Sequence, residues 1–281
     1  DKSLERLGRT KLNVLNQSMN HFVAVFDQIH NVRLKDTVGM DELSKFHLDK
    51  QGLIEIRELG SMATSVIGGL VGGAGAGALT AFGAYGATMT FAAASTGTAI
   101  ASLSGVAATN ATLAFLGGGA LAAGGGGMAL GSTILGGAVA GPAIAILGVV
   151  MNASASKNLD NAYSNKYKAE EAAESLKVVR TLCNGISKRS DMFTSLISKL
   201  DEILVELTAQ LEEIVNTRGT NFARFNETER GIVAMSMSVA GAIKKVLDTP
   251  ILTEAGELTE ESKVVHAEME KYIESIEVAD A

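Results

Sequence analysis

The sequence predicts an all-α protein, an elongated coiled-coil or helix bundle with a glycine-rich apolar head made of helical hairpins. Three observations lead to this fold class. Apolar residues on both sides of the chain's centre recur at alternating steps of three and four, as in packed helices. Aromatic residues make up only 5% of the chain, whereas strands favour aromatic and β-branched side chains. A long central block carries no charged residue at all.

The first element is a helical arm over residues 1–58, in which charges balance at nine basic and nine acidic residues. A break is expected near Asp36 or Thr37, either of which can cap a second short helix. The apolar seam of this arm consists of Leu12, Leu15, Met19, Phe22, Phe26 and Ile29.

The second element is the uncharged block, residues 59–156, which contains 23 of the 31 glycines. Uncharged apolar runs of about 18 residues or more are typical of transmembrane helices. The strongest candidates are residues 132–151 and residues 62–82. Phosphate-binding loops are excluded here, because no Lys or Arg lies in the block to meet a phosphate. A disordered linker is disfavoured by the Ile, Leu and Val content.

Glycine spacing within the block predicts close helix–helix packing. Small residues four apart form a flat stripe along one helix face, which lets two backbones approach each other. The residues predicted to pack in this way are Gly69, Gly73, Gly77, Gly97, Gly105, Gly127, Gly131, Gly137 and Gly141. The same composition fits three states: a permanent membrane span, a soluble state that can expose the block to lipid, or a tightly packed soluble core.

The third element, residues 157–248, is predicted to be a long coiled-coil helix followed by a returning helix. The long helix is expected over roughly 157–217, a length of about 90 Å, and ends where Gly219 supplies a left-handed cap. The returning helix is expected over roughly 222–248. The seam predicted for the long helix steps 4-3-4-3 through Ala172, Leu176, Val179, Cys183, Ile186, Ser190, Phe193, Ile197, Leu200, Leu204, Leu207, Leu211 and Ile214.

The fourth element, residues 249–281, is predicted to be an acidic helix whose first turn has a capping pattern at Thr259, Glu261 and Ser262. The formal net charge of −7 lies entirely after the uncharged block, because the first arm is neutral overall. A nucleic-acid partner is therefore not expected.

No residue pattern in this sequence predicts a catalytic site or a metal site. His21, His30, His47 and His266 are scattered without metal-ligand spacing, and the single cysteine, Cys183, falls in an apolar seam. We expect no enzyme, no cofactor, no metal and no small-molecule substrate.

The order of helix, central apolar block and long coiled-coil helix resembles the α-helical pore-forming toxins of the cytolysin A and haemolysin BL type. That resemblance implies an apolar head stored against a helical tail in the soluble form and inserted on oligomerisation. This chain differs in its high glycine content and in its shorter first arm. Residues 95–131 and 247–262 also look like segments of a group of uncharacterised bacterial glycine-rich proteins, which implies a bacterial origin.

The function expected from these features is membrane insertion and pore formation, as a toxin or membrane-acting effector. Its partners would be membrane lipid and further copies of the chain or related helical subunits. The protein would be membrane-associated with a soluble form, either cytoplasmic or secreted. The alternative is a soluble, non-enzymatic coiled-coil interaction or scaffold protein with a Gly/Ala-rich packed core.

Overall fold

The computed structural model describes residues 2–32, 46, 48, 51–60, 79, 82–85, 159–253 and 256–279. Within these residues the fold is all-α, as predicted, and the only β interactions are two isolated bridges, His30–Asn221 and Leu252–Leu258. Residues 51–60 are also helical. The labelled elements are α1 (Lys2–Val14), η1 (Leu15–Met19), α2 (Asn20–Phe26), α8 (Leu159–Arg218), η6 (Phe222–Arg224), α9 (Glu227–Asp248) and α10 (Glu260–Ala279).

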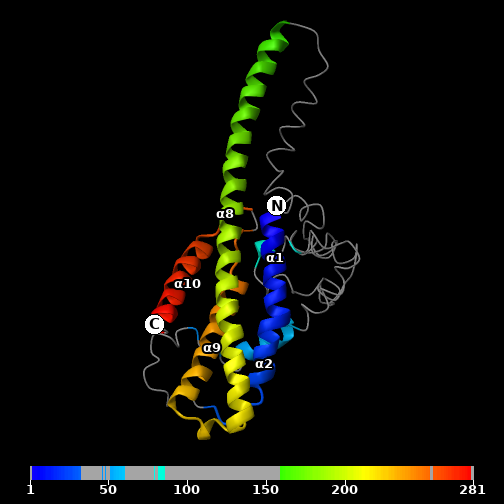
Figure 1. The fold of residues 1–281 in the computed structure, drawn as a ribbon. Helices are drawn as coiled ribbons and strands as arrows, with labels where there is room; N and C mark the ends of the chain where they lie inside the picture. The colour runs from blue at the N-terminus through cyan, green and yellow to red at the C-terminus, as the bar shows by residue number, and fades with distance from the viewer. Residues whose placement is uncertain are drawn as a thin grey trace.

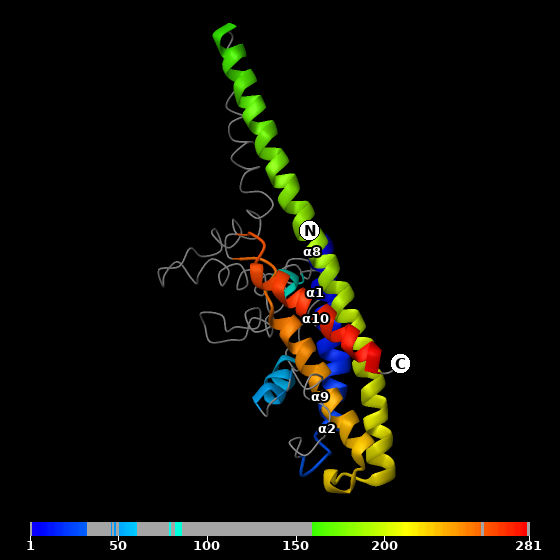
Figure 2. The same ribbon diagram turned by 90° about the vertical axis from the view of Figure 1, so that its left-hand side faces the viewer.

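The helix α8 is the longest described element, and the other labelled helices pack along its C-terminal part (Figures 1 and 2). The N-terminal arm runs parallel to α8: Ser3 bonds Ser187 near one end of the contact, and His21 pairs with Glu212 near the other. Helix α9 returns antiparallel to α8, and α10 runs antiparallel to α9, as the Lys245–Glu268 ion pair and the Tyr272–Ser238 hydrogen bond show.

Residues 2–26 of the first arm form one continuous rod with a π-helical turn, η1, between α1 and α2, and the break expected near Asp36 or Thr37 lies outside the described residues. All six residues of its predicted seam are buried, with exposed fractions of 7% or less. Asn20 follows the π-helical turn, and its side-chain amide donates to the Asn16 carbonyl. A π-turn inside an α-helix shifts the register of the apolar face and is frequent at functional positions.

The predicted long helix is confirmed, since α8 spans Leu159–Arg218 and ends at Gly219, whose φ is +83°. Its seam is buried from Ile186 onward: Phe193, Ile197, Leu200 and Leu204 have no exposed surface. Ser190 and Leu211 are also fully buried, Ile214 is 7% exposed, and Leu207 is partly buried against the core.

The returning helix begins at Glu227 rather than near 222. The side chain of Asn226 accepts a hydrogen bond from the Glu229 amide, and the Glu229 carboxylate accepts one from the Asn226 amide. This reciprocal capping box satisfies amides that a helix start leaves unpaired, so it fixes the first turn at Asn226. Residues Phe222–Arg224 form the separate 3₁₀ turn η6.

Helix α10 starts as its sequence predicts, because the Ser262 amide donates to the Thr259 hydroxyl. It packs on both α8 and α9. Tyr272 is buried, and its hydroxyl meets the Ser238 hydroxyl at 2.7 Å. Burial raises the pKa of Tyr272 to about 12. Phe46 lies edge-on to the Tyr272 ring at a centroid distance of 4.9 Å, which places Phe46 in the same core.

Candidate functional site

The candidate site is where the uncharged block meets the bundle. The block's described residues are Leu59, Gly60, Leu79 and residues 82–85, and every one of them is buried. We call residues 79 and 82–85 the docked segment. The nine glycines predicted to form packing stripes, Gly69, Gly73, Gly77, Gly97, Gly105, Gly127, Gly131, Gly137 and Gly141, lie outside the described residues.

Two other glycines bring the docked segment against α1. A Cβ added to Gly83 would collide with the Leu4 carbonyl, and a Cβ added to Gly8 would collide with the Leu79 carbonyl. The two backbones therefore approach closer than any larger residue allows. The contact is reciprocal, since each glycine faces a carbonyl of the other segment. Small residues that allow close backbone approach are thus used in the bundle itself, between the first arm and the block.

The docked segment is also fixed by backbone hydrogen bonds. The carbonyl of Ala84 accepts from the amide of Ile251 at 2.8 Å and from the amide of Leu252 at 3.1 Å. Ile251 and Leu252 lie just after α9 and are themselves buried. One carbonyl therefore joins the uncharged block to the turn between α9 and α10, and both amides lose this acceptor if the segment leaves.

Lys11 lies where α1, the docked segment and the end of α9 meet, a place we call the junction, and it has no exposed surface. Its Nζ is 3.3 Å from the Leu247 carbonyl and 3.5 Å from the Tyr85 carbonyl, and it lies 5.9 Å from the centroid of the Phe82 ring. Leu247 is in the last turn of α9, where carbonyls lack helical partners and the helix dipole is negative. Lys11 thus links α1, the end of α9 and the docked segment.

Burial lowers the pKa of Lys11 from 10.5 to about 7, although the negative charge of Asp248 acts in the opposite direction. An ammonium group removed from water loses its hydration, and two carbonyls and one aromatic face replace it only in part. Near neutral pH, the amine therefore exists in both charged and neutral forms while it stays buried.

A second glycine contact lies further along the first arm. A Cβ on Gly60 would collide with the side-chain carbonyl of Asn20, at the start of α2. Gly60 is the second residue of the uncharged block. Nearby, Arg57 pairs with Asp27. The first arm therefore holds the uncharged block at two places, Gly60 and the docked segment.

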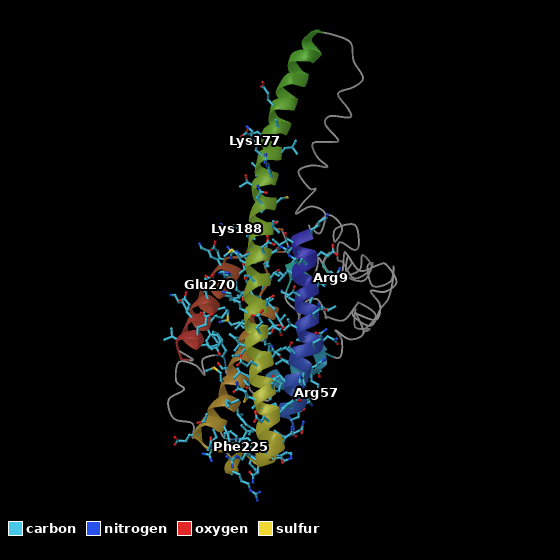
Figure 3. All side chains as sticks on the ribbon, viewed as in Figure 1. Arg9, Arg57, Lys177, Lys188, Phe225 and Glu270 are labelled. Atoms are coloured by element: carbon cyan, nitrogen blue, oxygen red, sulfur yellow. The ribbon has the colours of Figure 1, made fainter. Side chains whose placement is uncertain are left out.

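The N-terminal part of α8, residues 159–181, projects beyond the rest of the labelled bundle (Figure 1). Every residue of this part whose burial is described is exposed, including the seam residue Leu176 at 49% and Val178 at 67%. Val179 and Ala172 have no described side-chain burial. Lys177 lies on the projecting part, whereas Lys188 lies near the level where α1 begins (Figure 3). The seam residue Cys183, just below the projecting part, is a free, partly buried thiol.

The described histidines are separate from one another. His21 is exposed and pairs with Glu212 at 2.8 Å, His30 is exposed at the bridge to Asn221, and His266 is buried beside Glu270 at 3.3 Å. His47 lies outside the described residues. No group of three or more His, Cys, Asp or Glu in the described part of the chain is placed to hold a metal ion.

None of the helices within the described ranges combines the length and apolarity needed to cross a membrane.

Sequence reasoning did not identify Lys11, Gly8 or Gly83. The signal for Lys11 is its register: Leu4, Leu7, Lys11 and Leu15 follow one another at steps of three and four, so a lysine occupies an apolar-face position. Gly8 lies next to this face in a helix otherwise free of glycine, which raises the question of a close contact there.

No protein-family model matches this chain, and searches of curated proteins and of solved structures find no significant match.

Proposed function

We propose that this chain is an α-helical membrane-inserting, pore-forming protein, in which the arms shield the uncharged block in water and the block enters lipid. One observation carries the proposal. The docked segment is buried against α1 and the α9–α10 turn, where it is held by two hydrogen bonds to one carbonyl, a glycine-to-glycine approach, one buried amine and the packing of its apolar side chains. The proposal requires these contacts to open when the block enters lipid.

The remaining support comes from the sequence. The block has no charged residue over 98 positions, from Leu59 to Ser156, and several of its glycines lie four residues apart, as Gly69, Gly73 and Gly77 do. In lipid, such stripes replace the missing hydrophobic drive between helices with close van der Waals contact. Because glycine and alanine are weakly hydrophobic, we expect several copies to assemble before a water-filled pore forms.

Lipid insertion can be tested with a single tryptophan, since the chain contains none. Phe115→Trp places the probe within the uncharged block, and Phe225→Trp places a matched probe in the bundle, near the α8–α9 turn (Figure 3). The full-length variants are mixed with phosphatidylcholine vesicles, with or without phosphatidylglycerol, that contain brominated lipid and a trapped dye. We expect dye release, a blue shift and quenching at position 115, and little quenching at 225. Absence of both binding and release in all compositions would overturn the proposal.

The alternative, a soluble coiled-coil interaction protein, is favoured by one observation: the seam residue Leu176 is half exposed on the projecting part of α8. The seam there continues the register that is buried from Ile186 onward, so a second copy of α8 is the occupant that fits it. In a parallel, in-register pair, the two Cys183 residues would face each other. Oxidative cross-linking at Cys183, abolished by Leu176→Lys and accompanied by no lipid binding, would support this function over pore formation.

A further inference from the structure

We propose that Lys11 is a pH-sensitive switch, which keeps the docked segment against α1 while its amine is neutral and favours release once the amine is protonated. This inference concerns the regulation of the same site and rests on the proposed function for its biological meaning. Its geometry is independent of lipid: Lys11 is fully buried, and two of the groups around it, the Tyr85 carbonyl and the Phe82 ring, belong to the docked segment.

Release of the docked segment would uncover the Lys11 amine. Phe82 and Tyr85 are 2% and 3% exposed, and they are the docked-segment residues that contact the Lys11 amine. With them gone, water replaces the Tyr85 carbonyl and the Phe82 ring around the amine. A hydrated ammonium is far more stable than a buried one, so protonation favours the released state.

The charged groups that face Lys11 come from other elements. Asp248, the last residue of α9, is the acid whose charge acts on the amine. Asp248 is also bound to Lys244 at 2.7 Å, and Lys244 binds Glu55 of the helical residues 51–60 at 2.9 Å. The charge of Asp248 is therefore partly compensated by Lys244. From the docked segment, the titratable residue is Tyr85, whose backbone carbonyl, rather than its phenol, accepts from Lys11.

The direction of the effect follows from the two states. The pKa of Lys11 is about 7 when docked and returns toward 10.5 when hydrated. Between these values the docked state binds fewer protons than the released state, so docking strengthens as pH rises from about 7 and weakens as pH falls. Below about pH 7, both states are protonated and Lys11 adds no further pH dependence. These two values predict about 30-fold more release at pH 6 than at pH 8.5.

Hydrogen exchange in the full-length protein without lipid tests the switch directly. The amides of Ile251 and Leu252 bond the Ala84 carbonyl, so their exchange reports release of the docked segment. After correction for intrinsic exchange, we expect their protection to fall about 30-fold from pH 8.5 to pH 6 and then to level off. The amide of Arg230, bonded to the Asn226 carbonyl at the far end of α9, is the internal reference and should change little.

Two variants remove the titratable amine of Lys11. Lys11→Gln keeps a donor for the carbonyls, and Lys11→Met replaces the amine with an apolar group of similar length. Either folded variant should show pH-independent protection at Ile251 and Leu252. The switch is overturned if the wild-type protection does not change between pH 8.5 and 6, or if Lys11→Gln keeps the full change.

The vesicle experiment separates the switch from the proposed function. Release of the docked segment at low pH, together with no lipid binding, would support the switch and overturn pore formation. Lipid insertion with a rate that is equal at pH 8.5 and pH 6, and unaffected by Lys11→Gln, would support pore formation and overturn the switch. Faster insertion at pH 6 that is lost in Lys11→Gln would support both.

Discussion

The projecting part of α8 and the part from Ile186 to Ile214 follow the same heptad repeat but have different surroundings. From Ile186 to Ile214, the seam is covered by α1, α2, α9 and α10, and Phe193 has no exposed surface. In the projecting part, Leu176 follows the same register and is 49% exposed. A heptad pattern therefore specifies which face of a helix is apolar, while the lengths of the neighbouring helices determine where that face is covered. The covered part serves stability, whereas Leu176 and Val178 in the projecting part are exposed.

The largest expected effect is a difference in the free energy of unfolding between variants in these two parts of α8. Phe193→Ala leaves a cavity at the centre of the covered seam and should lower the free energy of unfolding by about 3–5 kcal/mol. Leu176→Ala, at the same repeat in the projecting part, should change it by less than about 0.5 kcal/mol. Urea denaturation followed by circular dichroism measures both. Equal losses in the two variants would show that the projecting part is covered in solution.

The second prediction concerns how the first arm, which covers α8, holds the docked segment. Gly83→Ala places a methyl group against the Leu4 carbonyl and should destabilise the docked arrangement by about 1–3 kcal/mol. Gly231→Ala is the matched control, because a Cβ there meets no atom within 4 Å, and it should stabilise α9 by about 0.5–1 kcal/mol. Hydrogen exchange at Leu252 measures release of the segment in each variant.

If the docked segment is the stored start of a membrane-inserting block, Gly83→Ala should also release vesicle dye faster than the wild-type protein. Gly231→Ala should not. A variant at position 83 with wild-type protection at Leu252 would mean that the close approach of Gly8 and Gly83 does not hold the segment.

Local sequence signals predicted much of the fold. The 3-4 spacing located the long helix to within two residues at its start, Gly219 marked its end, and Thr259 marked the start of α10. The start of α9 was predicted too early, because Phe222 and Phe225 lie three residues apart, a spacing that is typical of the apolar face of a helix. Both are buried, but the capping box at Asn226 starts the helix after them.

The junction could not be predicted in the same way, because it depends on residues that are distant in sequence. Lys11, Tyr85 and Leu247 are brought together by three different segments. Glycine spacing drew attention to stripes within the block, whereas the described glycine contacts join different segments: Gly8 with the docked segment, Gly60 with Asn20, and Gly241 with the Phe46 backbone. Such pairs have no periodic signature, since each needs only one close approach.

The third prediction tests how the start of α9 is held against the C-terminal part of α8. Asn226→Ala removes the side chain that accepts from the Glu229 amide, and loss of such a cap costs about 1 kcal/mol. The Glu229 carboxylate also bonds Arg218, the last residue of α8, at 2.8 Å. Asn226→Asp should keep the cap and therefore most of the stability. Thermal denaturation of the three proteins measures the difference, and equal melting temperatures would show that water replaces the cap.

The smallest expected effect lies where α10 covers Phe193. The His266 ring lies 6.2 Å from the Phe193 ring, and burial together with the charge of Arg189 lowers its pKa, while Glu270 acts in the opposite direction. The folded state then binds fewer protons than the unfolded state just below pH 6.5, so stability should decline as pH falls through this region. His266→Leu should reduce that slope, because leucine does not titrate. Urea midpoints at pH 7.5 and pH 5.5 measure the slope in both proteins. Leu176→Ala, which leaves the covered part unchanged, should retain the wild-type slope, so a reduced slope in that variant would show that the two parts of α8 are coupled.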